Sequence, residues 1–351
     1  MISLLCSAAI LSSAFSGASA QAAPSSHPKL AVAINVKENG TPEDFVKELR
    51  FQIRIGLNGS LGSFKWEDLE PPQGDRNLKP LADYLGLLPI MEADSAVTIQ
   101  TIDTTNRTVP ADLPQNWDDP LMLARWDSLL NQIIPALGKH VKYVSLGNEV
   151  DVRLLANPGE LKGYKTFLNR GKETIQKLRS DLKVGVTVTG GTILTQPQYA
   201  LDLTKELDLL FVTYYAIGPN FKVKTPTEIQ SDLNRLLAFD PGRKMIISEI
   251  GMPASEVIGG SEAKQAAFVS QVFKTFSGKG SKVPLLAWFI TTDFSPPMVD
   301  LFQTYYGLKD PSFAAYLATL GLKDHTGRPR LAYKTFSQES QNWVPAIGSN
   351  P

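Results

Sequence analysis

Short apolar runs alternate along the chain with longer segments in which apolar residues recur every three or four positions. The first pattern is typical of buried parallel strands, and the second of amphipathic helices. The expected strands cover residues 30–36, 59–65, 96–102, 141–146, 183–189, 209–214, 244–249 and 283–290. The helical segments that follow them cover residues 42–53, 78–88, 120–137, 160–182, 197–207, 227–239, 261–276 and 311–320.

Eight strand–helix units in succession favour a single (β/α)₈ barrel of the α/β class, a TIM barrel. The alternative is an open doubly wound sheet, which commonly has a glycine-rich phosphate turn after its first strand. The segment after the first expected strand, Val36-Lys37-Glu38-Asn39-Gly40, does not fit that pattern. We therefore predict one catalytic domain over residues 29–345, preceded by a linker at 21–28.

The first twenty residues have the pattern of a secretory signal. Residues 2–15 are apolar or small, and Ala18-Ser19-Ala20 places small residues where a signal peptidase requires them. We expect cleavage before Gln21 and a secreted or periplasmic protein; the alternative is a short buried helix or a membrane anchor. The only cysteine, Cys6, lies in this segment, so the mature protein is expected to have no disulfide.

Two expected strands end in a glutamate, Glu149 in one case and Glu249 in the other. Catalytic groups of barrel enzymes lie at the carboxyl ends of the strands. Glycoside hydrolysis needs two carboxyl groups, one to protonate the departing oxygen and one to attack the anomeric carbon or activate water. We predict that these two glutamates face each other at the barrel mouth. The alternative for each is a solvated loop, helix-capping or salt-bridged residue.

Four segments resemble motifs of clan A glycoside hydrolases, which are retaining TIM-barrel enzymes, in the order expected for that clan. Leu146-Gly147-Asn148-Glu149 resembles the Asn-Glu that ends strand four. Ser248-Glu249-Ile250-Gly251-Met252-Pro253 is similar to the Glu-x-Gly-x-Pro of the galactanase and β-1,3-glucanase families. Phe64-Lys65-Trp66-Glu67-Asp68-Leu69-Glu70-Pro71 resembles the Trp…Glu-Pro segment, and Gly327-Arg328-Pro329-Arg330-Leu331-Ala332-Tyr333 resembles the closing element.

The resemblance implies Glu149 as general acid/base and Glu249 as nucleophile. Asn148 is expected to bind the sugar hydroxyl next to the reacting carbon. The resemblance further implies that a tyrosine hydrogen-bonds the nucleophile, and we favour Tyr214 over Tyr215 for this role. It also implies that Trp288 forms a floor under the sugar, and Trp66 is a candidate for a wall of the cleft. For the two tyrosines and for Trp288 the alternative is a packing role.

One position departs from the clan. Many members have an arginine on strand two beside the nucleophile, whereas the corresponding position here is Leu61 or a neighbour. Arg107, after strand three, is a candidate substitute cation. The departure is the support for an alternative function, a catalytically silent carbohydrate-binding barrel. A transglycosylase would use the same residues with a sugar as acceptor.

Charge and composition narrow the range of partners. Lys and Arg number 35 and Asp and Glu number 35, so the zero formal charge gives no electrostatic case for nucleic acid or an anionic membrane. His27, His140 and His325 are scattered, and neither a metal nor a cofactor is expected. The expected partner is an oligo- or polysaccharide. The remaining polar residues after strands are candidates for sugar hydroxyls or ordinary loop residues: Asp103, Asn106, Arg107, Asp151 and Asp293.

Overall fold

The computed structural model describes residues 26–72 and 75–343, which form an α/β fold with parallel main sheets. The expected signal peptide, most of the linker and residues 344–345 lie outside these residues. By internal contacts the chain divides into two compact units. The first unit contains Ser60–Thr213 and Gly242–Ile246, and the second contains Ser26–Gly59, Tyr214–Pro241 and the chain from Ile247 onward. The helices and parallel strands of the described residues confirm the predicted α/β class.

The first unit is built on a four-stranded sheet in the order β2-β3-β6-β7, formed by Gly59–Lys65, Asp94–Gln100, Val141–Ser145 and Lys183–Gly185. The β3–β6 and β6–β7 pairs are parallel. The expected fifth strand is divided, because β8 (Thr187–Thr189) pairs instead with β9 (Leu209–Tyr215). A short antiparallel hairpin, β4 (Ile102–Asp103) and β5 (Asn106–Arg107), follows β3.

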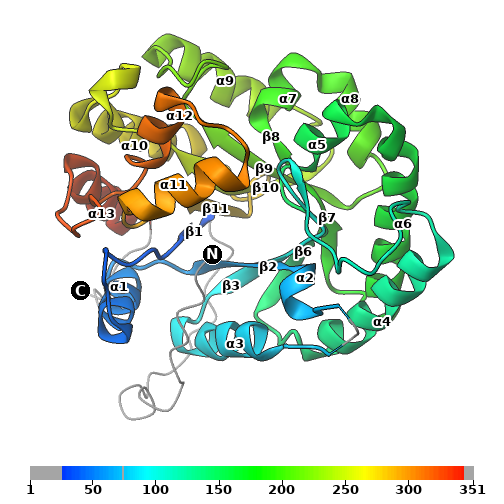
Figure 1. Cartoon of the computed structure of the whole chain (residues 1–351). Coiled ribbons are helices and arrows are strands. Elements are labelled where there is room, and N and C mark those ends of the chain that lie inside the picture. The colour runs from blue at the N-terminus through cyan, green and yellow to red at the C-terminus, as the bar shows by residue number, and fades with distance from the viewer. Residues whose placement is uncertain (1–25, 73–74, 344–351) are drawn as a thin grey trace. The chain divides into compact units, whose positions relative to one another are not determined.

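The first unit also contains the helices that follow its strands (Figure 1). They are α2 (Trp66–Leu69), α3 (Lys79–Met91), α4 (Pro120–Ala136), α5 (Val150–Ala156), α6 (Leu161–Leu178), α7 (Gly190–Thr195) and α8 (Pro197–Thr204), with a 3₁₀ turn at Pro158–Glu160. Helix α4 begins at a proline behind Asp119, whose carboxylate accepts from the Leu121 amide. Trp126 on α4 stacks on Phe167 of α6, and both are fully buried.

The second unit contains β1 (Lys29–Val32), β11 (Leu285–Trp288) and most of β10 (Lys244–Gly251), which are neighbours in the order β1-β11-β10. β1 and β11 are parallel. Its helices are α1 (Pro42–Arg54), α9 (Pro226–Ala238), α10 (Glu262–Phe276), α11 (Pro296–Tyr305), α12 (Pro311–Leu317) and α13 (Leu331–Trp343), with a 3₁₀ turn at Glu256–Ile258. Helices α1 and α9 both begin with a complete capping box and a proline in the first turn.

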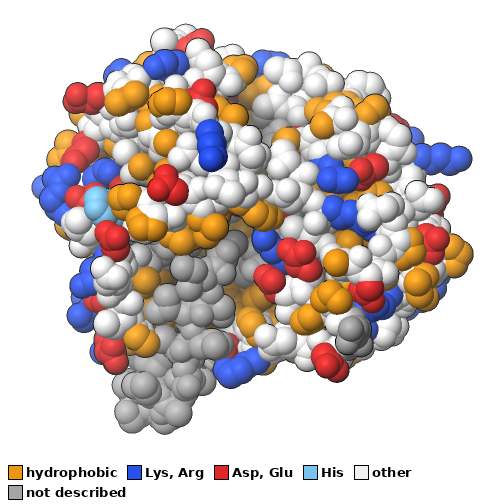
Figure 2. Space-filling view, viewed as in Figure 1, with side chains coloured by type: hydrophobic (Ala, Val, Ile, Leu, Met, Phe, Trp, Pro, Cys, Tyr) orange, Lys and Arg blue, Asp and Glu red, His pale blue; other side chains and the backbone are white. Residues whose placement is uncertain are grey.

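The region after β11 contains more helix than the pattern predicts. The closing element runs into α13, which packs on α10 through contacts of Phe336 and Trp343 with Phe273. Helix α11 was not expected, and hydrophobic side chains gather over it in Figure 2. Leu301 on this helix is 55% exposed. None of the helices in the described part of the chain is long and apolar enough to cross a bilayer.

Candidate active site

Glu149 lies at the turn between β6 and α5. Gly147 allows this turn, because a Cβ there would lie 2.5 Å from both the Tyr164 hydroxyl and Val150. Glu149 itself has φ 47° and ψ 42°, a left-handed conformation that costs a residue with a side chain roughly 1–2 kcal/mol. Strain of this kind is concentrated at functional sites, where the surrounding structure enforces it.

Two threonine hydroxyls bind the Glu149 carboxylate. Thr213 Oγ1 donates to Oε1 at 2.7 Å, and Thr104 Oγ1 donates to Oε2 at 2.9 Å. Burial raises the pKa of Glu149 to about 7, the threonine hydroxyls act in the opposite direction, and the carboxylates of Asp151 and Asp103 add to the rise. Glu149 is therefore a carboxyl group that can be protonated or ionised near neutral pH.

Asn148 belongs to the same polar group. Its side-chain amide donates to Asp103 Oδ1 at 3.1 Å, and its backbone amide donates to the Ile102 carbonyl. The prediction that Asn148 lies beside Glu149 at a strand end agrees with this geometry, while its contact with a sugar stays a prediction. Asp103, one of the candidate loop residues, orients Asn148.

Glu249 lies near the end of β10 in the second unit and is partly exposed. The Tyr215 hydroxyl donates a short hydrogen bond to Glu249 Oε2. A phenol donating to a carboxylate stabilises the ionised form and fixes the orientation of the remaining oxygen. These are the properties required of a carboxylate nucleophile.

The choice of Tyr214 over Tyr215 is wrong. Tyr214 is 3% exposed, and its hydroxyl donates to Asp232 on α9 at 3.0 Å. Successive side chains on a strand point to opposite faces, so only one of the two tyrosines can reach Glu249. Tyr214 faces helix α9, and Tyr215 makes the hydrogen bond to Glu249 that was expected of Tyr214.

Trp288 is also not the expected sugar floor. Its side chain is fully buried and contacts Phe268 of α10 and Phe336 of α13. The next residue, Phe289, is partly exposed and meets the ring of Tyr215 edge-to-face at 5.7 Å. Phe289 therefore packs on Tyr215, as Tyr316 does at 5.3 Å, and neither was among the residues predicted from the sequence.

The side chains of Trp66 and Arg107 both contact neighbouring residues of the first unit. Trp66 is fully buried, its indole donates to Glu70 at 2.9 Å, and its ring packs on Trp126. It therefore does not form a cleft wall. The Arg107 guanidinium lies 4.8 Å above the Trp117 ring and donates to Gln115 at 2.9 Å, so its contacts hold its own loop.

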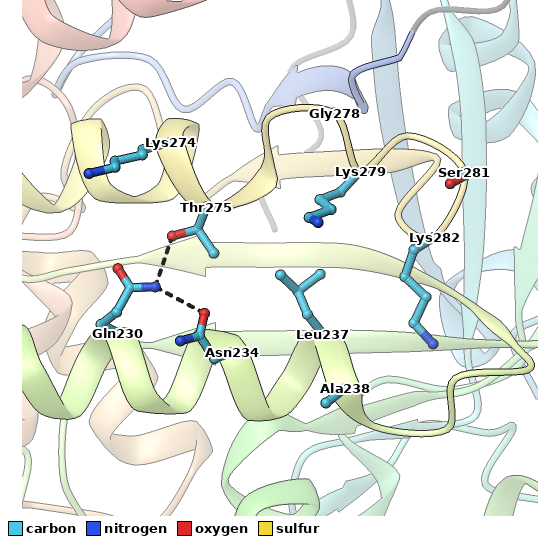
Figure 3. Close-up of a pocket in the computed structure, with 10 residues that line it drawn as sticks. All are labelled: Gln230, Asn234, Leu237, Ala238, Lys274, Thr275, Gly278, Lys279, Ser281 and Lys282. Atoms are coloured by element: carbon cyan, nitrogen blue, oxygen red, sulfur yellow. Dashed lines mark hydrogen bonds between the residues drawn. The ribbon is translucent and has the colours of Figure 1, made fainter.

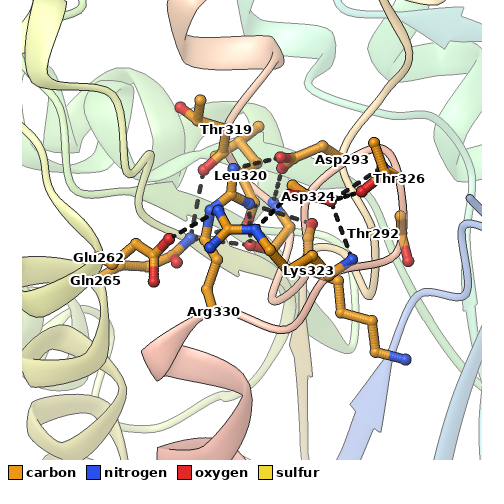
Figure 4. Close-up of polar contacts among 12 residues, drawn as sticks. Glu262, Gln265, Thr292, Asp293, Thr319, Leu320, Lys323, Asp324, Thr326 and Arg330 are labelled. Atoms are coloured by element: carbon orange, nitrogen blue, oxygen red, sulfur yellow. Dashed lines mark hydrogen bonds and ion pairs between the residues drawn. The ribbon is translucent and has the colours of Figure 1, made fainter.

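Asp293 is a structural residue rather than a sugar ligand. It is 1% exposed, accepts from the Gly321 amide at 2.6 Å and pairs with Arg330 at 2.5 Å. Arg330 in turn donates to the carbonyls of Gly321 and Lys323, so it ties the loop after β11 to the closing segment (Figure 4). Asp151 is likewise fully buried, and it accepts from the amide and hydroxyl of Thr189.

A hollow in the second unit has different chemistry. It measures about 870 Å³ and lies between the C-terminal parts of α9 and α10 (Figure 3). Its charged lining consists of Lys274, Lys279 and Lys282, without a carboxylate. It therefore lacks an acid/base pair. Among residues 26–72 and 75–343, no group of three or more His, Cys, Asp or Glu side chains is arranged to hold a metal ion.

Comparison with known proteins relates the fold to glycoside hydrolases. No protein-family model and no curated protein matches the sequence. The exo-β-1,4-mannosidase of Opitutaceae bacterium strain TAV5 has a TM-score of 0.69 at 15% identity, over 91% of this chain and 60% of that chain. This chain thus spans less than two thirds of that mannosidase.

Two further solved structures show the same similarity. A GH5_18 from Bifidobacterium longum subsp. infantis has a TM-score of 0.66 at 16% identity, over 92% of this chain and 81% of the other. A family 39 glycoside hydrolase from Bacteroides cellulosilyticus WH2 has a TM-score of 0.63 at 14% identity, over 91% of this chain and 65% of the hydrolase. The chain shares its fold with these enzymes, as its resemblance to clan A implied. Because one fold hosts many functions, activity is argued from the site.

Proposed function

We propose that this protein is a retaining glycoside hydrolase that acts on a β-linked glycan and is built on a closed (β/α)₈ barrel over residues 29–345. The observation that carries the proposal is Glu149, a strand-end carboxyl group whose pKa of about 7 suits proton transfer at neutral pH. The hydrogen bond from Tyr215 to Glu249 supports the second role, and the shared fold supports the reaction class.

The reaction would proceed by double displacement. Glu249 attacks the anomeric carbon, the bond to the leaving oxygen breaks, and protonated Glu149 gives its proton to that oxygen. The resulting ester on Glu249 is then hydrolysed, because ionised Glu149 takes a proton from water as the water oxygen attacks the anomeric carbon. Glu249 leaves as a carboxylate, which the Tyr215 hydroxyl stabilises. No cofactor takes part.

The first substrates to test are β-mannosides. The neighbours include an exo-β-1,4-mannosidase and a GH5_18 from Streptomyces cattleya in complex with Manβ1-4GlcNAc. A neutral saccharide also fits a chain of zero formal charge. From the apolar leader we further propose that the enzyme is exported.

The test is covalent trapping. The protein is incubated with 2-fluoro-β-glycosides that have activated leaving groups, including the mannoside and glucoside, and its intact mass is followed. We expect one adduct, which peptide mapping places on Glu249 and which Glu249→Ala abolishes. Binding of the sugars without any adduct or turnover across the panel would favour the silent carbohydrate-binding protein.

A further inference from the structure

The hairpin after β3 is fastened to the segment that precedes Glu149. Asn148 donates its backbone amide to the Ile102 carbonyl at 2.8 Å, and its own carbonyl accepts from the Thr104 amide at 2.9 Å. Asp103 and Asn148 pair as a parallel bridge and through their side chains. This ladder fixes the position of Thr104 relative to Glu149.

Thr104 is an unfavourable residue for its backbone conformation. Its φ of 57° lies in the left-handed region, where a β-branched residue is an outlier and glycine or asparagine is preferred. The side chain has a specific contact that glycine would lack, because its hydroxyl donates to Glu149 Oε2. The second hydroxyl on Glu149 comes from a different element, Thr213 on β9, and reaches the other oxygen.

We infer that Thr104 and Thr213 are positioning residues for Glu149, which hold one carboxylate oxygen each; this inference rests on the proposed role of Glu149 as acid/base. Both hydroxyls donate, so they favour the carboxylate. Burial favours the neutral acid, and so do the nearby carboxyl groups of Asp151 and Asp103. The opposed effects keep Glu149 usable in both half-reactions, as acid in the first and as base in the second.

Loss of one hydroxyl should move the titration of Glu149 upward. A hydrogen bond to a charged group corresponds to about one pKa unit or somewhat more. In Thr213→Val and in Thr104→Gly, the basic limb of kcat/KM should therefore shift to higher pH by about one unit. Thr213→Ser and Thr104→Ser keep the hydroxyls and should keep the wild-type limb.

The titration is measured directly as well as through activity. The protein is labelled with ¹³C at the glutamate carboxyl carbons, and the Glu149 signal is assigned as the one absent from Glu149→Gln. We expect its pKa to rise in Thr213→Val and Thr104→Gly and to stay unchanged in the serine variants. Thr104→Gly should also unfold in urea at no lower a midpoint than the wild type, because glycine relieves the left-handed backbone.

The outcomes separate this inference from the proposed function. An unchanged Glu149 pKa in both hydroxyl-deleted variants overturns the inference, even if the wild type is an active glycosidase. A shift in the hydroxyl-deleted variants that the serine variants also show overturns it too, because the hydroxyl would then not be the cause. Absence of turnover by the wild type would defeat the proposed function, while the carboxyl titration would still decide whether the two threonines control Glu149.

Discussion

At the scale of single residues, Tyr214 and Tyr215 offer a matched pair. They are adjacent on β9, but Tyr214 donates to Asp232 whereas Tyr215 donates to Glu249. We expect Tyr215→Phe to lower kcat by about 10- to 100-fold, the size of one lost hydrogen bond to a charged group. The loss should fall mainly on the second step, because the hydroxyl stabilises Glu249 as it leaves. Steady-state and burst kinetics with an activated glycoside check this.

Tyr214→Phe is the control. Asp232 retains its ion pair with Lys224 at 2.6 Å, so the variant should lose about 1–2 kcal/mol of unfolding free energy and keep its kcat. A fall in kcat in Tyr214→Phe, with Tyr215→Phe unaffected, would reverse the assignment made from the hydrogen bonds.

The alternation of side chains between the two faces of a strand explains what the sequence could and could not predict about this site. The two glutamates, and Asn148, are recognisable because they end apolar runs. The choice between Tyr214 and Tyr215, or Trp288 and Phe289, depends on which face of the strand each occupies. A strand that is buried on both faces has apolar residues pointing to both sides of the sheet. Its sequence pattern therefore does not show which residues face the helices and which face the site. The contact of Thr104 with Glu149 could not be predicted from the sequence either, because it depends on the pairing of the β4–β5 hairpin with Asn148.

At the scale of elements, the closing segment depends on one buried ion pair. Arg330 and Asp293 are 8% and 1% exposed in their side chains and join the loop after β11 to the segment before α13. We expect Arg330→Met to lower the free energy of unfolding at pH 8 by about 3–5 kcal/mol, because it leaves a buried carboxylate unpaired. Urea denaturation measures this loss.

The pH dependence of that loss has a definite sign. Burial raises the pKa of Asp293 to about 6 even beside Arg330, and removal of the arginine raises it further. The penalty is that of an ionised group, so it should be full at pH 8 and smaller at pH 5, where Asp293 is protonated. Arg328→Met is the control: Arg328 is 65% exposed in its ion pairs, so its loss should cost less than about 1 kcal/mol. An equal cost for the two variants would show that burial of the pair is irrelevant.

Long periodic elements were predictable, and short inserted ones were not. Helices α4, α6 and α10 have apolar periodicity over 15 residues or more, and the structure contains each of them. Helices α5, α7 and α11 have 10 residues or fewer, and tertiary packing rather than periodicity determines them. Helix α13 was not predicted either, although its buried Ala332 and Phe336 are four positions apart, as on one face of a helix.

At the scale of the whole molecule, the sequence supports the order of strands and helices better than it supports ring closure. Parallel pairs such as β1–β11 join residues about 250 positions apart, and local patterns contain no information on such pairings. The resemblance supplied that information, because the order of its motifs implies a fold. The fold shared with families 5 and 39 agrees with the motif order, although each identity is 16% or below.

The stereochemistry of the product tests whether Glu149 and Glu249 act as one catalytic pair. A double displacement requires two carboxyl groups about 5 Å apart, whereas a single displacement by water requires roughly 6.5–9.5 Å. We expect the β-anomer to appear first when a β-glycoside is hydrolysed, and mutarotation to follow; ¹H NMR of the anomeric proton during the first minutes records this. Glu149→Ala with azide should give the β-glycosyl azide, because the anion replaces water in the second step without needing a base. An α-anomer as first product would mean that Glu249 does not form the glycosyl ester, and the assignment of nucleophile would have to be abandoned even for an active glycosidase.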